Sequence, residues 1–85
     1  MRIYDEKPVA ILIFLLDNGC SYITQIQNAV DTTTAHTLRI INFFEHEKIV
    51  ATSKTSRIRK VQLTAKGIEV AEHLKETERI MGDAL

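Results

Sequence analysis

Several features that would define a protein's class are scarce in this chain of 85 residues. It has one cysteine, one proline, three glycines and no tryptophan. A single cysteine, Cys20, cannot form a disulfide within the chain, so the fold does not depend on an oxidising compartment. The scarcity of proline and glycine leaves no room for a long linker. The length therefore predicts a single small domain over residues 1–85.

Long apolar runs are also missing. The longest uncharged apolar run, from Val9 to Leu16, has eight residues, whereas a helix that spans a bilayer needs roughly 20. The start of the chain lacks the basic segment and the small-residue cleavage site of a signal peptide. The sequence therefore predicts a cytoplasmic protein with no membrane partner.

Net charge is absent as well, because eleven Lys and Arg balance eleven Asp and Glu. The charges are nevertheless unevenly distributed. Residues 32–66 contain seven of the positive and two of the negative side chains, a net charge of +5. The flanking segments 1–31 and 67–85 carry net charges of −2 and −3. A basic block between acidic ends indicates a polyanionic partner such as nucleic acid.

Catalytic and metal-binding patterns are not found. The sequence has no Gly-rich phosphate loop, no nucleophile elbow and no carboxylate pair on an apolar face. His36 and His46 are separated by about 15 Å along a helix, and no His or Cys pair has the spacing of a zinc site. Cys20 is interpreted as a small buried apolar residue. We therefore expect no enzymatic activity, no cofactor and no metal, and the residues identify no effector.

The first half of the chain shows three helical patterns. Acidic residues and a proline precede the apolar run that ends before Gly19, a residue suited to a helix C-terminus. Ile23 to Val30 has the spacing of a short second helix. Asp31-Thr32-Thr33-Thr34 offers several possible N-caps, and a third helix is predicted to follow it and to extend to about Lys48. Its inner stripe is formed by Thr37, Ile40, Ile41 and Phe44.

In the second half of the chain, the spacing of apolar residues changes from that of helices to that of strands. Residues 49–52 and 58–63 have the pattern of two strands joined by a polar turn. Thr64 is suited to cap a closing helix that extends to about Met81. The order is helix, helix, helix, hairpin, helix. This order predicts a mainly α fold with a small β-hairpin, a winged helix-turn-helix with a three-helix core, a two-stranded wing and a C-terminal helix.

Two segments carry a family resemblance. Phe44-Glu45-His46-Glu47-Lys48-Ile49-Val50 resembles the "Leu-Glu-x-x-Gly-Leu-Val" ending of a recognition helix. Arg57 to Gly67 is similar to the wing and the following helix start of MarR/ArsR-like transcriptional regulators. The resemblance covers roughly residues 9–81 and implies a small regulator that binds double-stranded DNA. Lys48 stands where the family often has glycine, so a less tight exit from the third helix is expected.

The resemblance also implies which residues meet DNA. The third helix would contact DNA with its start and outer face, and the wing with its cations. Arg39 is suited to guanine and Asn42 to adenine in the major groove, and the wing cations are suited to phosphates or the minor groove. The predicted DNA-binding residues are Thr33, Thr34, His36, Arg39, Asn42, Lys54, Arg57, Arg59 and Lys60.

Other interpretations remain open for these residues. Thr33 is equally suited to cap the third helix. Arg39 could be an ordinary solvated charge. The wing cations could serve to protect a strand edge from aggregation. Leu38 and Phe43 are apolar residues outside the inner stripe. They favour the alternative that the domain is a winged-helix protein-interaction module in a larger assembly, without DNA readout.

The two ends of the chain predict a homodimer. The first helix is apolar on all sides, and one small core covers only part of such a helix. The C-terminal helix, residues 64–85, extends beyond what one core needs. Pairing these surfaces across a twofold axis would bury both. The predicted dimer contacts are Ile11, Leu15, Leu74, Ile80, Met81 and Leu85.

Overall fold

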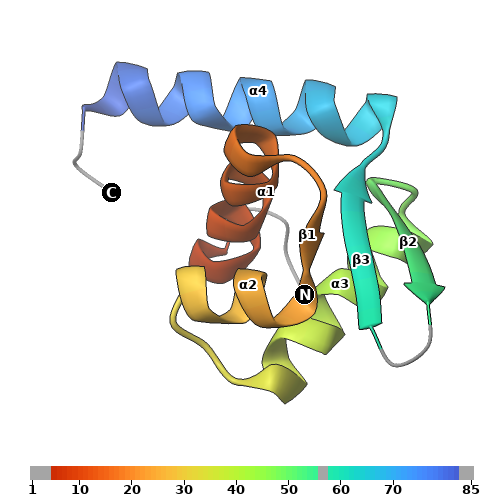
Figure 1. The fold of residues 1–85 in the computed structure, drawn as a ribbon. Coiled ribbons are helices and arrows are strands. Elements are labelled where there is room, and N and C mark those ends of the chain that lie inside the picture. Colours follow the sequence, from red (N-terminus) through yellow and green to blue (C-terminus); the bar gives the residue numbers. More distant parts are fainter. Residues whose placement is uncertain (1–4, 56–57, 83–85) are drawn as a thin grey trace.

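The computed structural model describes residues 5–55 and 58–82, which form four helices and three strands. In chain order the elements are α1 (Glu6–Asn18), β1 (Ser21–Tyr22), α2 (Ile23–Ala29), α3 (Thr34–His46), β2 (Val50–Thr55), β3 (Ile58–Leu63) and α4 (Ala65–Met81). In Figure 1, α4 lies across one end of the molecule with α1 beneath it, while α2 and α3 lie toward the opposite end. The winged helix-turn-helix predicted from the sequence is confirmed.

Local signals explain where the helices begin and end. Asp5 precedes α1 in an extended conformation, and Pro8 occupies the first turn, where its missing N–H has no intrahelical partner to lose. Gly19 ends α1 with φ of 75°, and its N–H donates to the Leu15 carbonyl at 2.9 Å. A left-handed conformation of this kind costs a glycine little because it has no Cβ.

One apolar core joins all four helices to the sheet. The predicted inner stripe of α3 is confirmed: Ile40, Ile41 and Phe44 are each 0% exposed. Thr37 is equally buried, and its hydroxyl is satisfied because it donates to the Thr33 carbonyl at 2.9 Å. The remaining buried apolar side chains come from α1, α2, β2, β3, α4 and two connecting segments, and they are Ile11, Leu12, Leu15, Ile26, Val30, Ile49, Val50, Val61 and Ala71.

The sheet has three strands rather than the predicted two. The strand order is β1-β3-β2, and both pairings are antiparallel. The short strand β1 pairs through Ser21 with Val61 and through Tyr22 with Lys60. Two residues are too few to show an alternating pattern, so this strand is defined by its partner and not by its own sequence. The hairpin of β2 and β3 is the predicted wing.

The exit from α3 is tighter than expected. Lys48 adopts the left-handed conformation, with φ of 62°, and the Ile49 N–H donates to the Phe44 carbonyl at 2.8 Å. Lys48 therefore makes the left-handed turn for which a glycine was expected. The expectation of a looser exit is wrong, because the packing of Ile49 and the residues after it fixes the backbone.

Two expectations about the start of the chain are also corrected. Cys20 is exposed, not buried, because it lies in the bend between α1 and β1. The apolar side chains of α1 that were expected to need a partner are largely covered by the chain itself, since α4 packs directly on this helix. Ile13, Phe14 and Leu16 on its other sides are half-buried.

Within the described residues, no helix is long and apolar enough to cross a membrane.

Candidate nucleic-acid interface

The turn between α2 and α3 is held by the first helix. Lys7 of α1 donates from Nζ to the carbonyls of Val30 and Asp31, at 2.8 and 3.3 Å. A cation at this point stabilises the C-terminus of α2. Asp31 has φ of 53°, a left-handed conformation that aspartate tolerates better than most residues. These contacts fix the angle at which α3 leaves α2.

The two threonines at the start of α3 have structural partners. The Thr33 hydroxyl accepts a hydrogen bond from the His36 N–H at 3.1 Å, which makes Thr33 the N-cap. The Thr34 hydroxyl donates to Gln27 Oε1 of α2 at 2.6 Å. Both side chains are exposed, but these hydrogen bonds first serve to position α3 against α2.

The outer face of α3 carries Arg39, Asn42 and His46, all of them exposed. His36, also predicted at the interface, is half-buried. Together with Arg39 it lines a hollow of about 410 Å³ against the start of α1, where Asp5 and Glu6 also lie. Arg39 therefore lies at the margin of the face, on a hollow that it shares with two carboxylates and Lys7.

The wing cations are divided between two faces of the hairpin. Lys54 pairs with Arg59 across the two strands, and Ser53 pairs with Lys60. Because successive side chains of a strand alternate, Lys54 and Arg59 share one face and Lys60 lies on the other. The Nζ atom of Lys60 lies 5.6 Å from the ring centroid of Tyr22, within reach of a cation–π interaction. Arg57 lies outside the described residues.

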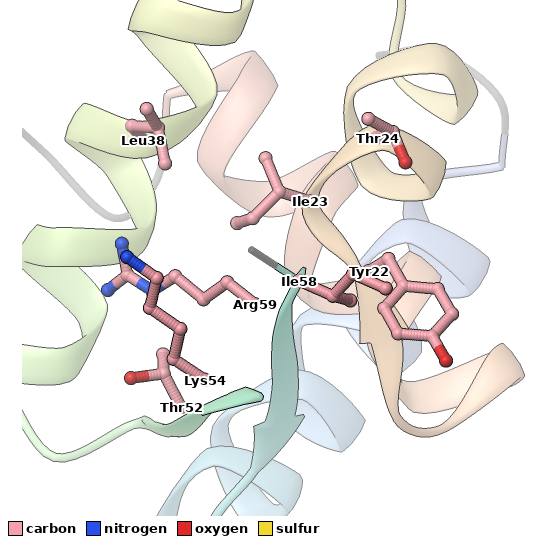
Figure 2. Close-up of a pocket in the computed structure, with 8 residues that line it drawn as sticks. All are labelled: Tyr22, Ile23, Thr24, Leu38, Thr52, Lys54, Ile58 and Arg59. Carbon is pink, nitrogen blue, oxygen red and sulfur yellow. The ribbon is translucent and has the colours of Figure 1, made fainter. Parts of the chain in front are cut away.

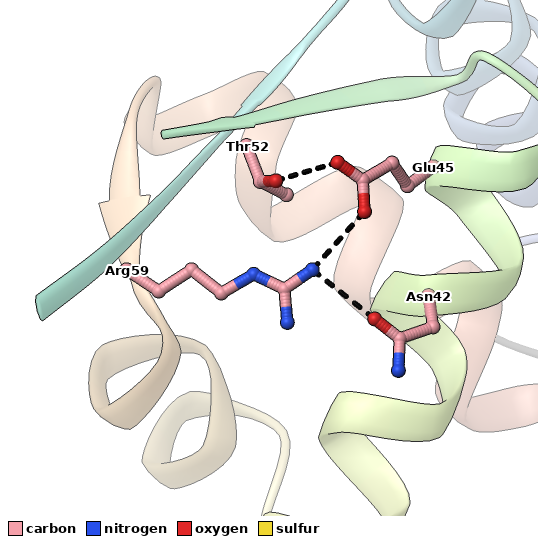
Figure 3. Close-up of polar contacts among 4 residues, drawn as sticks. All are labelled: Asn42, Glu45, Thr52 and Arg59. Atoms are coloured by element: carbon pink, nitrogen blue, oxygen red, sulfur yellow. Dashed lines mark hydrogen bonds and ion pairs between the residues drawn. The ribbon is translucent and has the colours of Figure 1, made fainter. Parts of the chain in front are cut away.

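Arg59 connects the hairpin to α3. One nitrogen of its guanidinium, Nη2, donates to Asn42 Oδ1 at 3.1 Å and to Glu45 Oε1 at 3.2 Å. The Thr52 hydroxyl donates to the other carboxylate oxygen, Glu45 Oε2, at 2.6 Å. Figure 3 shows these four side chains meeting between α3 and the hairpin. The fold thus brings together two predicted DNA contacts, Asn42 and Arg59, and binds them to each other.

Glu45 and Thr52 were missed at the sequence level. Glu45 lies three residues after Asn42 on α3, a spacing that puts both side chains on one side of the helix. Nothing in the local sequence shows that Arg59 faces them, because that depends on the register of the hairpin. The ion pair with Glu45 neutralises one of the predicted wing cations. Of the predicted DNA-binding cations that the structure describes, Arg39, Lys54 and Lys60 are left for a polyanion, with Lys60 on the other face of the hairpin from Lys54.

A groove of about 720 Å³ separates the wing from α2 and α3. In Figure 2, Lys54 and Arg59 extend from the hairpin toward α3, while Ile23 and Leu38 lie on the helical side. Leu38 is half-buried, and Ile58 at the rim is 52% exposed. The groove therefore combines cationic ends with an apolar floor.

Phe43, the other apolar residue outside the inner stripe, lies elsewhere. It is half-buried and packs against the core, with its ring centroid 5.8 Å from that of Phe44. Of the two side chains that favour a protein-interaction module, only Leu38 lines the groove.

The residues predicted for dimer contact lie in different environments. Ile11 and Leu15 are 0% and 2% exposed in the core. They are covered by the chain itself, which corrects the expectation that they form a partner surface. Leu74 is half-buried against the core, and Ile80 and Met81 are 69% and 54% exposed. Leu85 lies outside the described residues.

The far end of α4 combines these exposed apolar side chains with an ion pair. Arg79 donates to the carboxylate of Glu76, and this guanidinium lowers the pKa of the Glu76 carboxyl. In the part of the chain that the structure describes, no group of three or more His, Cys, Asp or Glu is placed to hold a metal ion.

Solved structures match the fold over nearly the whole chain. A protein from Archaeoglobus fulgidus is 28% identical, with a TM-score of 0.86, over 94% of this chain and 92% of that one. A transcriptional regulator homologue from Pyrococcus horikoshii is 31% identical, with a TM-score of 0.70, over 88% of this chain and 80% of that one. A MarR family transcriptional regulator from Silicibacter pomeroyi is 25% identical, with a TM-score of 0.79, over 94% of this chain.

The chain spans only 56% of the Silicibacter pomeroyi regulator, so that protein has a further part with no counterpart in the aligned residues. No protein-family model and no curated protein matches the sequence.

Proposed function

This chain belongs to the MarR-like winged-helix transcriptional regulators, and on that premise we propose that it recognises specific sequences in double-stranded DNA. In this proposal α3 enters the major groove, and the β2–β3 hairpin contacts the phosphate backbone or the minor groove. Contacts to phosphates supply most of the affinity, whereas contacts to base edges supply the sequence preference. The chain acts by binding and not by catalysis.

One observation carries this proposal. In Figure 1, α3 lies toward the opposite end of the molecule from α4, beside the β2–β3 hairpin. Arg39 and Asn42 are exposed on α3, and Lys54 and Lys60 are exposed on the hairpin, so one duplex could meet both elements. Arg39 and Asn42 then face the bases, while Lys54 and Lys60 reach phosphates on the two sides of the hairpin. The other predicted contacts, Thr33, Thr34 and His36, lie where α3 begins.

The proposal includes a homodimer. The exposed apolar pair Ile80 and Met81, with Leu74 and Leu85, would form the contact at the α4 end, across a twofold axis. An axis at this end leaves both copies of α3 free. Two recognition helices about 34 Å apart would then read a palindromic site in successive major grooves.

A binding titration tests the central claim. The full chain is titrated against a mixed-sequence duplex at two salt concentrations, and we expect binding that weakens as the salt concentration rises. Lys54→Met should weaken binding, whereas Lys75→Met, which removes the same charge on α4, should leave it unchanged. An absence of binding at the lower salt concentration contradicts the proposal.

A second candidate function is a protein-contact module in a larger assembly. The observation that favours it is the groove between the wing and α3, with Leu38 on its floor and the exposed Ile58 at its rim. This candidate gains support if the duplex titration fails, because its groove overlaps the surface proposed for DNA.

A further inference from the structure

The contact between Arg59 and Asn42 determines which groups of Asn42 are available to a ligand. A guanidinium has only donors and no acceptor. The amide atom that faces Arg59 at 3.1 Å must therefore be the oxygen, Oδ1. The amide nitrogen, Nδ2, then lies on the other side of the amide group, as Figure 3 shows. Asn42 is exposed, so both hydrogens of Nδ2 are available at the surface.

Arg59 is itself held in place. It shares Nη2 between Asn42 and Glu45, and its side chain is only 25% exposed. Glu45 is held by Thr52 through its second oxygen. Glu45, itself held by Thr52, thus fixes the charged donor, and this donor keeps the Asn42 amide in one orientation. The amide cannot turn over without placing its NH₂ group against the guanidinium.

The base pairs of DNA offer different partners to an amide. In the major groove, adenine presents an acceptor, N7, beside a donor, the N6 amino group, and an asparagine that reads adenine uses both its oxygen and its nitrogen. Guanine presents two acceptors, N7 and O6. An amide whose oxygen already accepts from a guanidinium offers adenine a weaker second hydrogen bond. Its two free N–H groups match the guanine edge.

We propose that Asn42 is a specificity-determining residue that selects guanine over adenine, and that Arg59 is the positioning residue that imposes this choice. The inference rests on the proposed DNA-binding function and refines it. It replaces the sequence-level expectation that Asn42 pairs with adenine, and it removes Arg59 from the phosphate contacts. Glu45 then acts within the protein, as the counter-charge that holds Arg59.

The experiment is a selection of preferred duplexes from a randomised pool, followed by affinity measurements on the selected site. Asn42→Ala identifies the base pair that Asn42 reads, because the preference at that position alone should disappear. The wild type should prefer guanine there, by roughly tenfold over adenine. In the selected site, 7-deazaguanine at that position, which lacks N7, should weaken binding, and inosine, which keeps N7 and O6, should not.

Variants of Arg59 then separate its positioning role from its charge. Arg59→Met removes the donor and should move the preference at this position from guanine toward adenine. Arg59→Lys keeps a donor-only cation and should keep guanine. The matched control is Lys54→Met on the paired strand. It removes one positive charge from the same face and should weaken binding to all sequences without changing the preferred base.

Each outcome decides the inference. Adenine at the Asn42-dependent position of the wild type overturns it, and so does an Arg59→Met variant that keeps guanine. A selected site in which Asn42→Ala alters no position also overturns it, while leaving DNA recognition by this chain intact. A wild-type chain that binds no duplex overturns both the inference and the proposed function.

Discussion

The carbonyl oxygen of Ile49 lies 1.9 Å from the point that a Cβ atom on Gly67 would occupy. The same oxygen accepts the Thr64 N–H at 3.0 Å. The first turn of α4 is therefore packed onto the backbone that leaves α3, at a distance that only a glycine allows. Thr64 completes the junction, because its hydroxyl donates to the Lys48 carbonyl at 2.7 Å and accepts from the Gly67 N–H at 3.0 Å.

Gly67→Ala should destabilise the protein. In most helices alanine is better than glycine by up to about 1 kcal/mol. Here the new methyl group meets a backbone carbonyl that cannot move aside, so we expect a loss of roughly 1–3 kcal/mol in the free energy of unfolding. Chemical denaturation measures it. Ala65→Gly, in the same turn, should lose only the ordinary helix propensity. A Gly67→Ala variant as stable as the wild type would refute the close approach.

Lys48→Gly should stabilise the protein. Lys48 has φ of 62°, a conformation that costs a residue with a Cβ about 1 kcal/mol, and glycine removes that cost. The gain is partly offset by the greater freedom of glycine in the unfolded chain. We expect a rise of about 0.5 kcal/mol in the free energy of unfolding. Glu47→Gly is the control, since Glu47 has φ of −82° and should lose stability. Equal effects of the two substitutions would contradict the argument.

The salt dependence of DNA binding should separate the wing cations from the Arg59–Glu45 pair. Lys54→Met and Lys60→Met should each reduce the slope of log K against log salt by about 0.9, if each lysine neutralises one phosphate. Arg59→Met combined with Glu45→Gln leaves the net charge unchanged and should leave the slope unchanged. Fluorescence anisotropy on one duplex at several salt concentrations measures these slopes. A flatter slope in the double variant would make Arg59 a phosphate contact.

Arg39→Ala should distinguish base readout from phosphate contact on α3. If Arg39 reads a base, the loss on a selected site should be about 1–3 kcal/mol and clearly smaller on random duplexes. Arg79→Ala, at the α4 end, should change neither affinity. Equal losses on both kinds of duplex would assign Arg39 to the phosphate backbone. No loss on either would favour the protein-contact module.

The proposed dimer depends on the exposed apolar pair of α4. We expect a mass near twice that of the chain in sedimentation equilibrium. Replacement of Ile80 and Met81 by aspartate should shift the protein toward monomer. Ile58→Asp, an equally drastic change at an exposed apolar residue of the wing, should leave the mass unchanged. A wild-type chain that stays monomeric at high micromolar concentration would disprove the dimer.

Short-range signals in the sequence are enough to predict the four helices and most of their ends. Gly19, Thr33 and Thr64 mark boundaries because capping depends on backbone groups only a few residues away. The inner stripe of α3 was also readable, since a period of 3.6 residues fixes which side chains share a face. The two strands of the wing were predicted because the apolar spacing changes there from the helical period to the alternation of a strand. All of these signals act over short stretches of chain.

Contacts between residues far apart in the sequence depend on how the whole chain folds. The strand β1 exists because Ser21 and Tyr22 pair with β3, and no local sequence pattern predicts such a pairing. The positive charge of Arg59 suggested a phosphate contact. The register of the hairpin instead places Arg59 on the face that meets Asn42. The glycine at position 67 belonged to a recognisable motif, yet its necessity comes from the carbonyl of Ile49. In each case the deciding contact joins segments far apart in sequence, where the geometry depends on how the whole core packs.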